Sequence, residues 1–127
     1  MMNDLLEKIE KYHHFVDGMF ECIRSHHAGD GAKDVEMVFY AKDHSVSGDV
    51  WKNVLVRLKN VQEVFYSAEG GQSSAMASGV RLLSFDELLC VEVDGVYEHD
   101  KEPQSIEEIR KYGTCYAIGK DVEIFEM

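Results

Sequence analysis

The sequence predicts an α+β protein with a largely antiparallel sheet, and two observations carry this prediction. Many short segments of the 127-residue chain alternate apolar and polar side chains, which is the period of a half-buried strand. Two segments instead have helical spacing, one near each end, and both open on a capping box. Because strands outnumber helices and short turns join them, we expect one antiparallel sheet covered by the two helices. We expect residues 1–127 to form a single domain.

The first segments predict a helix followed by a hairpin. Asp4 and Glu7 form the first capping box, and apolar residues recur at helical spacing, which predicts an amphipathic helix over residues 4–13. Residues 19–27 and 35–42 alternate on either side of a glycine-rich turn. This pattern is typical of a β-hairpin.

The middle of the chain predicts further strands followed by a loop. Residues 50–66 are rich in β-branched and aromatic side chains, which indicates either one long strand with a bulge or two strands joined at Lys59-Asn60. Residues 67–79 carry mainly small side chains with too little bulk for a core, so we expect a mobile loop there.

The second half predicts three more strands, the last two joined by a turn. Residues 80–85 and 88–93 are strand-like, and Asp94-Gly95 predicts a turn into a short strand at 96–99.

The last part predicts the second helix. Ser105 and Glu108 form a capping box and Gly113 follows as a C-cap, so we expect a helix near residues 105–112. Residues 114–118 and 122–125 should close the chain as a hairpin.

Charge is unevenly distributed along this acidic chain. The formal net charge is −11; residues 1–60 hold 10 acids and 8 bases, whereas residues 61–127 hold 14 acids and 5 bases. A field of this sign repels nucleic acid and anionic membrane and attracts cationic groups. We therefore expect neither a nucleic-acid nor a membrane partner. A solvated acidic face without a specific partner is the plainer interpretation.

Strand alternation in residues 88–93 predicts where these acids lie. Apolar side chains at every second position would face the core, so the intervening acids would point outward and meet those that follow the turn. The predicted partner-binding patch consists of Glu92, Asp94, Glu98, Asp100 and Glu102.

Cysteine, histidine and glycine patterns do not support a cofactor or a catalytic centre. The three cysteines are widely spaced, and the adjacent histidine pairs cannot normally chelate one ion. We predict no metal ligand, no catalytic residue and no cofactor, although His13 or His14 with Asp17 could join His99 or Asp100 in a composite site. No apolar run approaches the roughly 20 residues of a membrane span, so we expect a cytoplasmic protein.

Three aromatic residues leave two alternatives open. Trp51, Phe65 and Tyr66 could form an exposed partner patch, but core packing is the more frequent role of large apolar side chains.

The layout resembles a group of small bacterial proteins. A helix leading into residues 14–18, a hairpin, and then the segment 51–61 resemble α+β proteins of accessory and mobile DNA, which include uncharacterised gene-cassette products and toxin-immunity proteins. The resemblance spans residues 10–94 as an order of elements. It implies an acidic inhibitor of a basic partner, and it assigns no site residue.

The sequence therefore favours a non-enzymatic acidic module that binds a cationic protein partner in an immunity-like manner. The alternative is a small-molecule-binding or small enzymatic domain that uses the sheet face and residues 67–79. Open sheet edges also predict a homodimer.

Overall fold

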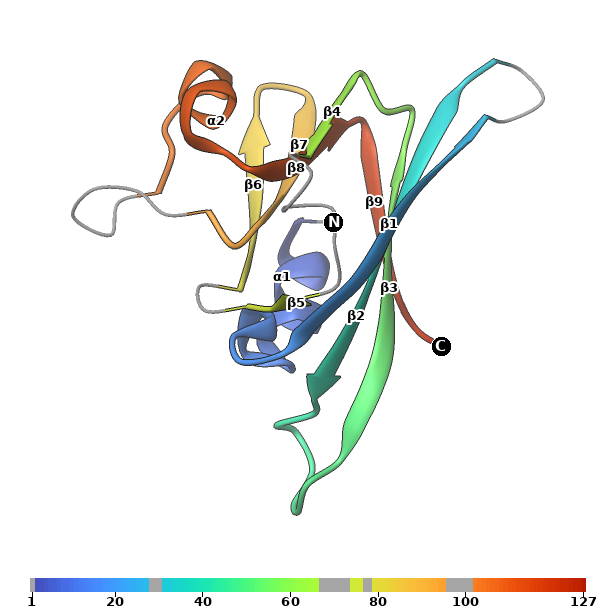
Figure 1. Ribbon diagram of the computed structural model, residues 1–127, viewed down its shortest axis with the longest axis vertical. Helices are drawn as coiled ribbons and strands as arrows, with labels where there is room; N and C mark the ends of the chain where they lie inside the picture. Colours follow the sequence, from blue (N-terminus) through green and yellow to red (C-terminus); the bar gives the residue numbers. More distant parts are fainter. Residues whose placement is uncertain (1, 28–30, 67–73, 77–78, 96–101) are drawn as a thin grey trace.

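The computed structural model describes residues 2–27, 31–66, 74–76, 79–95 and 102–127. Within these residues the chain forms two α-helices, a 3-10 turn and a series of strands (Figure 1). In chain order the elements are α1 (Met2–Glu10), η1 (His13–Phe15), β1 (Met19–His27), β2 (Lys33–Lys42), β3 (Trp51–Lys59), β4 (Glu63–Tyr66), β5 (Ser74–Ala75), β6 (Val80–Phe85), β7 (Leu88–Val93), α2 (Ile106–Tyr112), β8 (Cys115–Gly119) and β9 (Asp121–Glu126).

The strands form two sheets that face each other across the core. Sheet A has five strands in the order β5-β1-β2-β3-β9, and sheet B has four in the order β4-β8-β7-β6. Each strand pairing in the described residues is antiparallel. The α+β class with antiparallel pairing is therefore confirmed, but the strands make two sheets instead of one.

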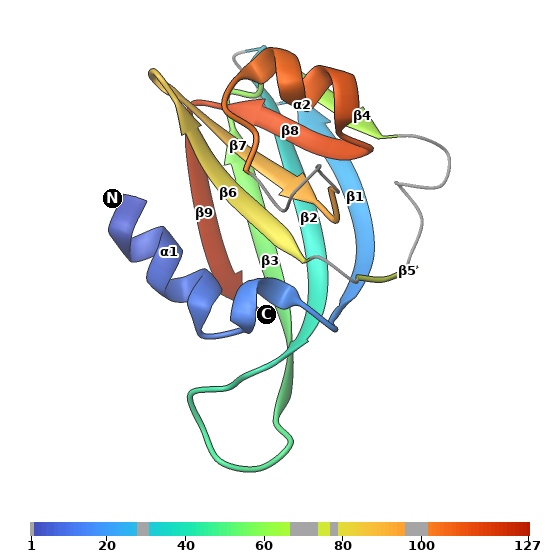
Figure 2. The same ribbon diagram turned by 90° about the vertical axis from the view of Figure 1, so that its left-hand side faces the viewer.

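The main core fills the space between the sheets. Phe39 on β2 is fully buried, and its ring stacks on Phe15 of η1 with the ring centroids 4.7 Å apart. Leu5 and Ile9 on α1 belong to the same core. A first helix is thus confirmed, but it spans Met2–Glu10 instead of residues 4–13, so Asp4 lies inside its first turn and the predicted capping position is wrong. The helix lies beside β9 at one side of the gap between the sheets (Figure 2).

The second helix lies on the other side of sheet B. Its Ile109 is fully buried against Leu83, Cys90, Tyr116 and Ile118, which form a second, smaller core. The predicted cap is confirmed, since the Glu108 amide donates to Ser105 Oγ at 3.2 Å. The two helices therefore pack on opposite sides of sheet B and do not share one face.

The chain passes twice between the sheets at one corner. Asn60, with φ 53°, separates β3 in sheet A from β4 in sheet B, so the two-strand alternative for residues 50–66 is the correct one. The Lys120 amide donates to the Lys59 carbonyl at 3.1 Å where the chain crosses back. The predicted closing hairpin is wrong, because β8 stays in sheet B while β9 pairs with β3.

Part of the expected mobile loop belongs to the folded structure. Ser74 and Ala75 pair with β1, and Met76 is only 2% exposed in the main core. The prediction of a mobile loop is wrong for these three residues. The pairing of Ser74 and Ala75 with β1 and the burial of Met76 hold this segment against sheet A. Residues 67–73 and 77–78, and the predicted strand at 96–99, lie outside the described residues.

Candidate functional site

Glu92, the first residue of the predicted acidic patch, is buried with 0% exposure. Its side chain points away from the main core, as the alternation predicted, but that side of sheet B is covered. Gly95 and Gly113 lie directly against its carboxylate, and a Cβ atom at Gly95 would come within 2.5 Å of Glu92 Cδ. Arg81 Nη1 lies 3.2 Å from Glu92 Oε1. The expected exposure of Glu92 is wrong because α2 packs on this side of sheet B and the backbone at Gly95 and Gly113 lies against the carboxylate.

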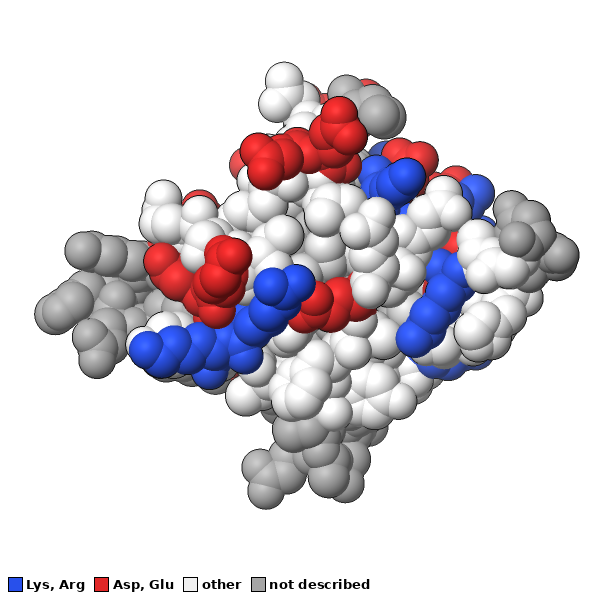
Figure 3. Space-filling view, turned by 90° about the horizontal axis from the view of Figure 1, so that it is seen from above, with Lys and Arg blue, Asp and Glu red and all other residues white. Residues whose placement is uncertain are grey.

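The remaining members of the patch are only partly described. Asp94 is half-buried and Glu102 is exposed, whereas Glu98 and Asp100 lie outside the described residues. On the face seen in Figure 3, the red carboxylates stand in separate groups with uncharged, lysine and arginine side chains between them. Because Glu92 is buried, it cannot be part of an exposed binding surface. A binding surface made of acids must use other carboxylates of the chain.

A groove of about 400 Å³ opens where α1, the β6–β7 turn and the β8–β9 turn meet. Its apolar lining comes from four residues that are far apart in the sequence: Met2, Leu5, Leu89 and Val122. Leu5 and Val122 are main-core residues, and Met2 and Leu89 pack against that core. The groove floor is therefore an extension of the core to the surface.

Four exposed carboxylates surround this floor. Asp4 comes from the first turn of α1, Asp86 and Glu87 from the β6–β7 turn, and Asp121 from the start of β9. Within the described part of the chain no ion pair engages Asp86, Glu87 or Asp121. Lys120 is the single base in the lining, so the rim carries a net negative charge.

The tight turn between β6 and β7 holds two of these acids at the rim. Phe85 pairs with Leu88, which leaves Asp86 and Glu87 as the two turn residues. Asp86 has φ 57°, a left-handed conformation that aspartate adopts more readily than most side chains. The same turn also lines a second, more open hollow of about 810 Å³.

A second charged cluster lies on the outer face of sheet A. Glu36 accepts hydrogen bonds from Arg24 Nε at 2.9 Å and Arg57 Nη2 at 2.8 Å, and its Oε1 lies 2.8 Å from His26 Nε2. Burial opposes ionisation of Glu36, but the contacts from Arg57, His26 and Arg24 outweigh it and lower its pKa from 4.5 to about 2. These charges are paired within the chain.

A third cluster fastens both ends of the chain to sheet A. Lys11 Nζ lies 2.8 Å from Glu126 Oε1, and the Tyr12 hydroxyl donates to the same carboxylate. Hydrogen bonds from Lys11 and Tyr12 lower the pKa of Glu126 to about 2. Lys52 Nζ lies 2.9 Å from the fully buried Asp43, whose pKa is lowered by hydrogen bonds from Ser45 and Lys52. This cluster is structural, since every member has a partner.

Two of the three cysteines are buried, and the described histidines, cysteines and acids form no candidate metal centre. Cys90 and Cys115 are buried, and burial followed by the charge of Glu92 raises the pKa of each thiol to about 12. Thiols of this kind stay protonated and are poor nucleophiles. The described histidines, cysteines and acids include no group of three that could hold a metal ion. His99 and Asp100, two members of the composite site considered from the sequence, lie outside the described residues.

The three aromatic residues with two possible roles are all exposed. Trp51 is 39% exposed, Phe65 46% and Tyr66 49%, so core packing is the wrong interpretation. Trp51 lies on sheet A, whereas Phe65 and Tyr66 lie on β4 of sheet B, and they do not form one patch.

Comparison of the chain with protein-family models, curated proteins and solved structures found no match. Among the described helices, neither combines the length and the apolar character that crossing a membrane requires.

Proposed function

We propose that this protein is a non-enzymatic interaction module and that its groove receives a cationic side chain of a partner protein. The observation that carries this proposal is the combination of an apolar floor with four exposed carboxylates at its rim. Three of these carboxylates are free of ion pairs within the described residues, in contrast to Glu36 and Asp43.

A lysine or arginine side chain suits both parts of the groove. Its methylene stem would cover the floor formed by Met2, Leu5, Leu89 and Val122, while its charged head would remain among the rim carboxylates. The net charge of −11 would speed the approach of a basic partner. Inhibition of a basic toxin is the most concrete form of this function, and it rests on the charge and on the layout resemblance.

A free amine is a second candidate ligand, since the groove volume of about 400 Å³ lies within the size range of small-molecule sites. Spermidine and hexalysine would both place ammonium groups at the rim. A protein partner presents its lysines on a large surface and would bind much more tightly than spermidine.

The decisive experiment is a titration with fluorescent hexalysine, followed by anisotropy and by amide chemical shifts. We expect binding at about 0.05 M salt that weakens at least about tenfold near 0.5 M salt, because screening shortens the range of the rim charges. The shifts should centre on the residues around Asp86 and Asp121. Unlabelled spermidine serves as the competitor.

A matched pair of variants separates the groove from the overall charge. The groove variant carries Asp86→Asn, Glu87→Gln and Asp121→Asn. The control variant carries Glu10→Gln, Glu21→Gln and Glu107→Gln, which are exposed acids outside the groove with the same total charge. We expect the groove variant alone to lose binding. Equal losses in both variants would show that hexalysine responds to net charge and would overturn the proposal.

A further inference from the structure

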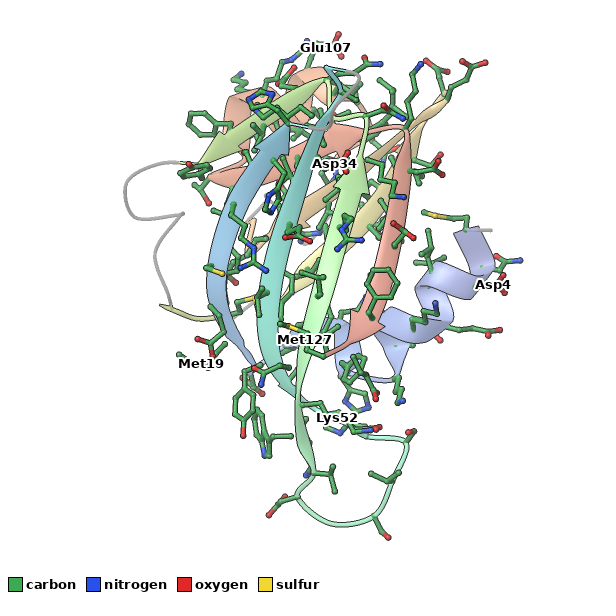
Figure 4. The ribbon with its side chains drawn as sticks, turned by 90° about the vertical axis from the view of Figure 1, so that its right-hand side faces the viewer. Asp4, Met19, Asp34, Lys52, Glu107 and Met127 are labelled. Atoms are coloured by element: carbon green, nitrogen blue, oxygen red, sulfur yellow. The ribbon has the colours of Figure 1, made fainter. Side chains whose placement is uncertain are left out.

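No element of the described residues covers one face of sheet A (Figure 4). Figure 4 looks directly at this outer face, and no described helix or strand crosses in front of β1, β2, β3 and β9. The inner face of the same sheet carries the main core. The composition of the outer face therefore decides whether it is an ordinary solvated surface or a contact surface.

Charged residues on the upper half of this face pair across the strands. The register places Arg24, Glu36, Arg57 and Glu123 side by side on β1, β2, β3 and β9, so that positive and negative charges alternate. Arg57 and Lys59 both approach Glu123, at 3.9 Å and 3.2 Å. This half offers little uncompensated charge to an incoming molecule.

The lower half carries most of the apolar side chains of this face, beside the polar Lys42 and Asn53. Val38 and Leu55 lie side by side in the register and are 8% and 9% exposed. Around them Tyr40, Trp51 and Phe125 are 38%, 39% and 40% exposed, and the Tyr40 and Trp51 rings stack with centroids 5.4 Å apart. Met127, 69% exposed, is labelled over this half in Figure 4. Aromatic residues, methionine and arginine are enriched at protein interfaces.

We infer that this outer face of sheet A is the contact surface of a two-fold homodimer. Its outward side chains include four bases, Arg24, Lys42, Arg57 and Lys59, and four acids, Asp34, Glu36, Asp121 and Glu123. The face is thus electrically balanced although the whole chain carries −11.

Charge balance is the reason to choose a second copy as the occupant. A strongly basic partner would gain little from a balanced face, whereas another copy of this acidic chain meets the least repulsion there. Two such faces would stack their apolar halves as paired sheets do, with the ion-paired rows as a polar rim. The groove around Asp86 shares β9 and Asp121 with this face, whereas the rest of its lining comes from α1, the β6–β7 turn and the β8–β9 turn.

Trp51 provides a direct test because it is the only tryptophan in the sequence. We expect its fluorescence to shift to the blue as protein concentration rises, in step with dimer formation measured by analytical ultracentrifugation. Added salt should strengthen the dimer by screening repulsion between two acidic chains. Hexalysine binding at the groove should weaken with salt, so the two processes are distinguishable.

Two variants and one control locate the contact. Phe125→Glu and Trp51→Glu should each raise the dimer dissociation constant at least about tenfold. Phe65→Glu changes an exposed aromatic residue on sheet B, 46% exposed, and should leave the constant unchanged. Circular dichroism confirms that each variant is folded.

Two results would overturn the inference. One is a wild-type protein that stays monomeric at about 1 mM and high salt, where even weak dimers of millimolar affinity form. The other is a dimer that survives Phe125→Glu and Trp51→Glu with its affinity intact, since it would then be held together elsewhere, for instance along the edge of β1.

Discussion

Single residues on this protein take their roles from what covers them. Glu92 and Glu102 are both glutamates of the acidic stretch, yet Glu92 is fully buried beside Arg81 whereas Glu102 is exposed. A buried carboxylate has lost its hydration and depends on its partner, while an exposed one keeps its water. The same substitution should therefore have very different consequences at the two positions.

Glu92→Gln is predicted to lower the free energy of unfolding by about 3 kcal/mol, because it removes the fully buried carboxylate that lies 3.2 Å from Arg81 Nη1. Glu102→Gln should change stability by less than about 0.5 kcal/mol, as is usual for an exposed residue. Urea unfolding followed by circular dichroism measures both. Equal stabilities of the two variants would mean that Glu92 is solvated in solution.

At the scale of elements, η1 and the segment at Gly79 hold each other in place. His13, His14 and Phe15 have φ of 49°, 54° and 60°, so this turn is left-handed throughout, and it carries Phe15 into the core. Gly79 packs against the backbone of this turn with φ 74°, and a Cβ atom there would collide with the His14 carbonyl oxygen. A strained turn of this kind persists because its surroundings hold it.

Gly79→Ala is predicted to destabilise the protein by about 3 kcal/mol or more, because the added methyl group has to push the η1 backbone aside. Gly48→Ala is the matched control: its φ of 89° is also left-handed, but no atom lies within 4 Å of the added Cβ. Strain alone should cost that variant about 1 kcal/mol. Thermal unfolding of the two variants separates the cost of the steric collision from the cost of backbone strain. A Gly79→Ala variant as stable as Gly48→Ala would contradict the close packing at Gly79.

At the scale of the whole molecule, opposing electrostatic effects determine stability in acid. Protonation relieves the repulsion within a chain of charge −11, which would favour the folded state at low pH. The ion-paired carboxylates act in the opposite direction. The pKa of Glu36 and that of Glu126 are lowered to about 2, and contacts with Arg110 lower the pKa of Glu63 despite its partial burial.

The melting temperature is predicted to fall steeply below pH 4.5, the ordinary pKa of a glutamate, and to keep falling toward pH 2. A lowered pKa in the folded state means that the unfolded chain binds more protons, so this stabilisation is complete above pH 4.5 and is lost on acidification. Glu36→Gln should melt lower at neutral pH and show a shallower acid slope. A melting temperature that rises below pH 4.5 would show that relief of repulsion dominates instead.

The local pattern of the chain was sufficient to predict most elements. The first helix, the second helix with its Ser105 cap, the β1–β2 hairpin and the β6–β7 pair all follow from periodicity and turn residues close in sequence. Such features depend on interactions over a few residues, which a sequence displays directly. The alternation also correctly predicted that the Glu92 side chain points away from the main core, although it did not predict that this side is covered.

Tertiary structure alone decided what each face meets. The alternation of side chains within a strand carries no information about which element packs on each face. It does not show that α2 covers sheet B, that β9 joins sheet A instead of pairing with β8, or that Met76 lies in the core. The groove unites Asp4, Asp86 and Asp121, whose separation along the chain hides their proximity. The local sequence pattern therefore determined the helices and strands. The packing of the two sheets and α2 determined which charged side chains are buried, which are paired and which stay exposed to a partner.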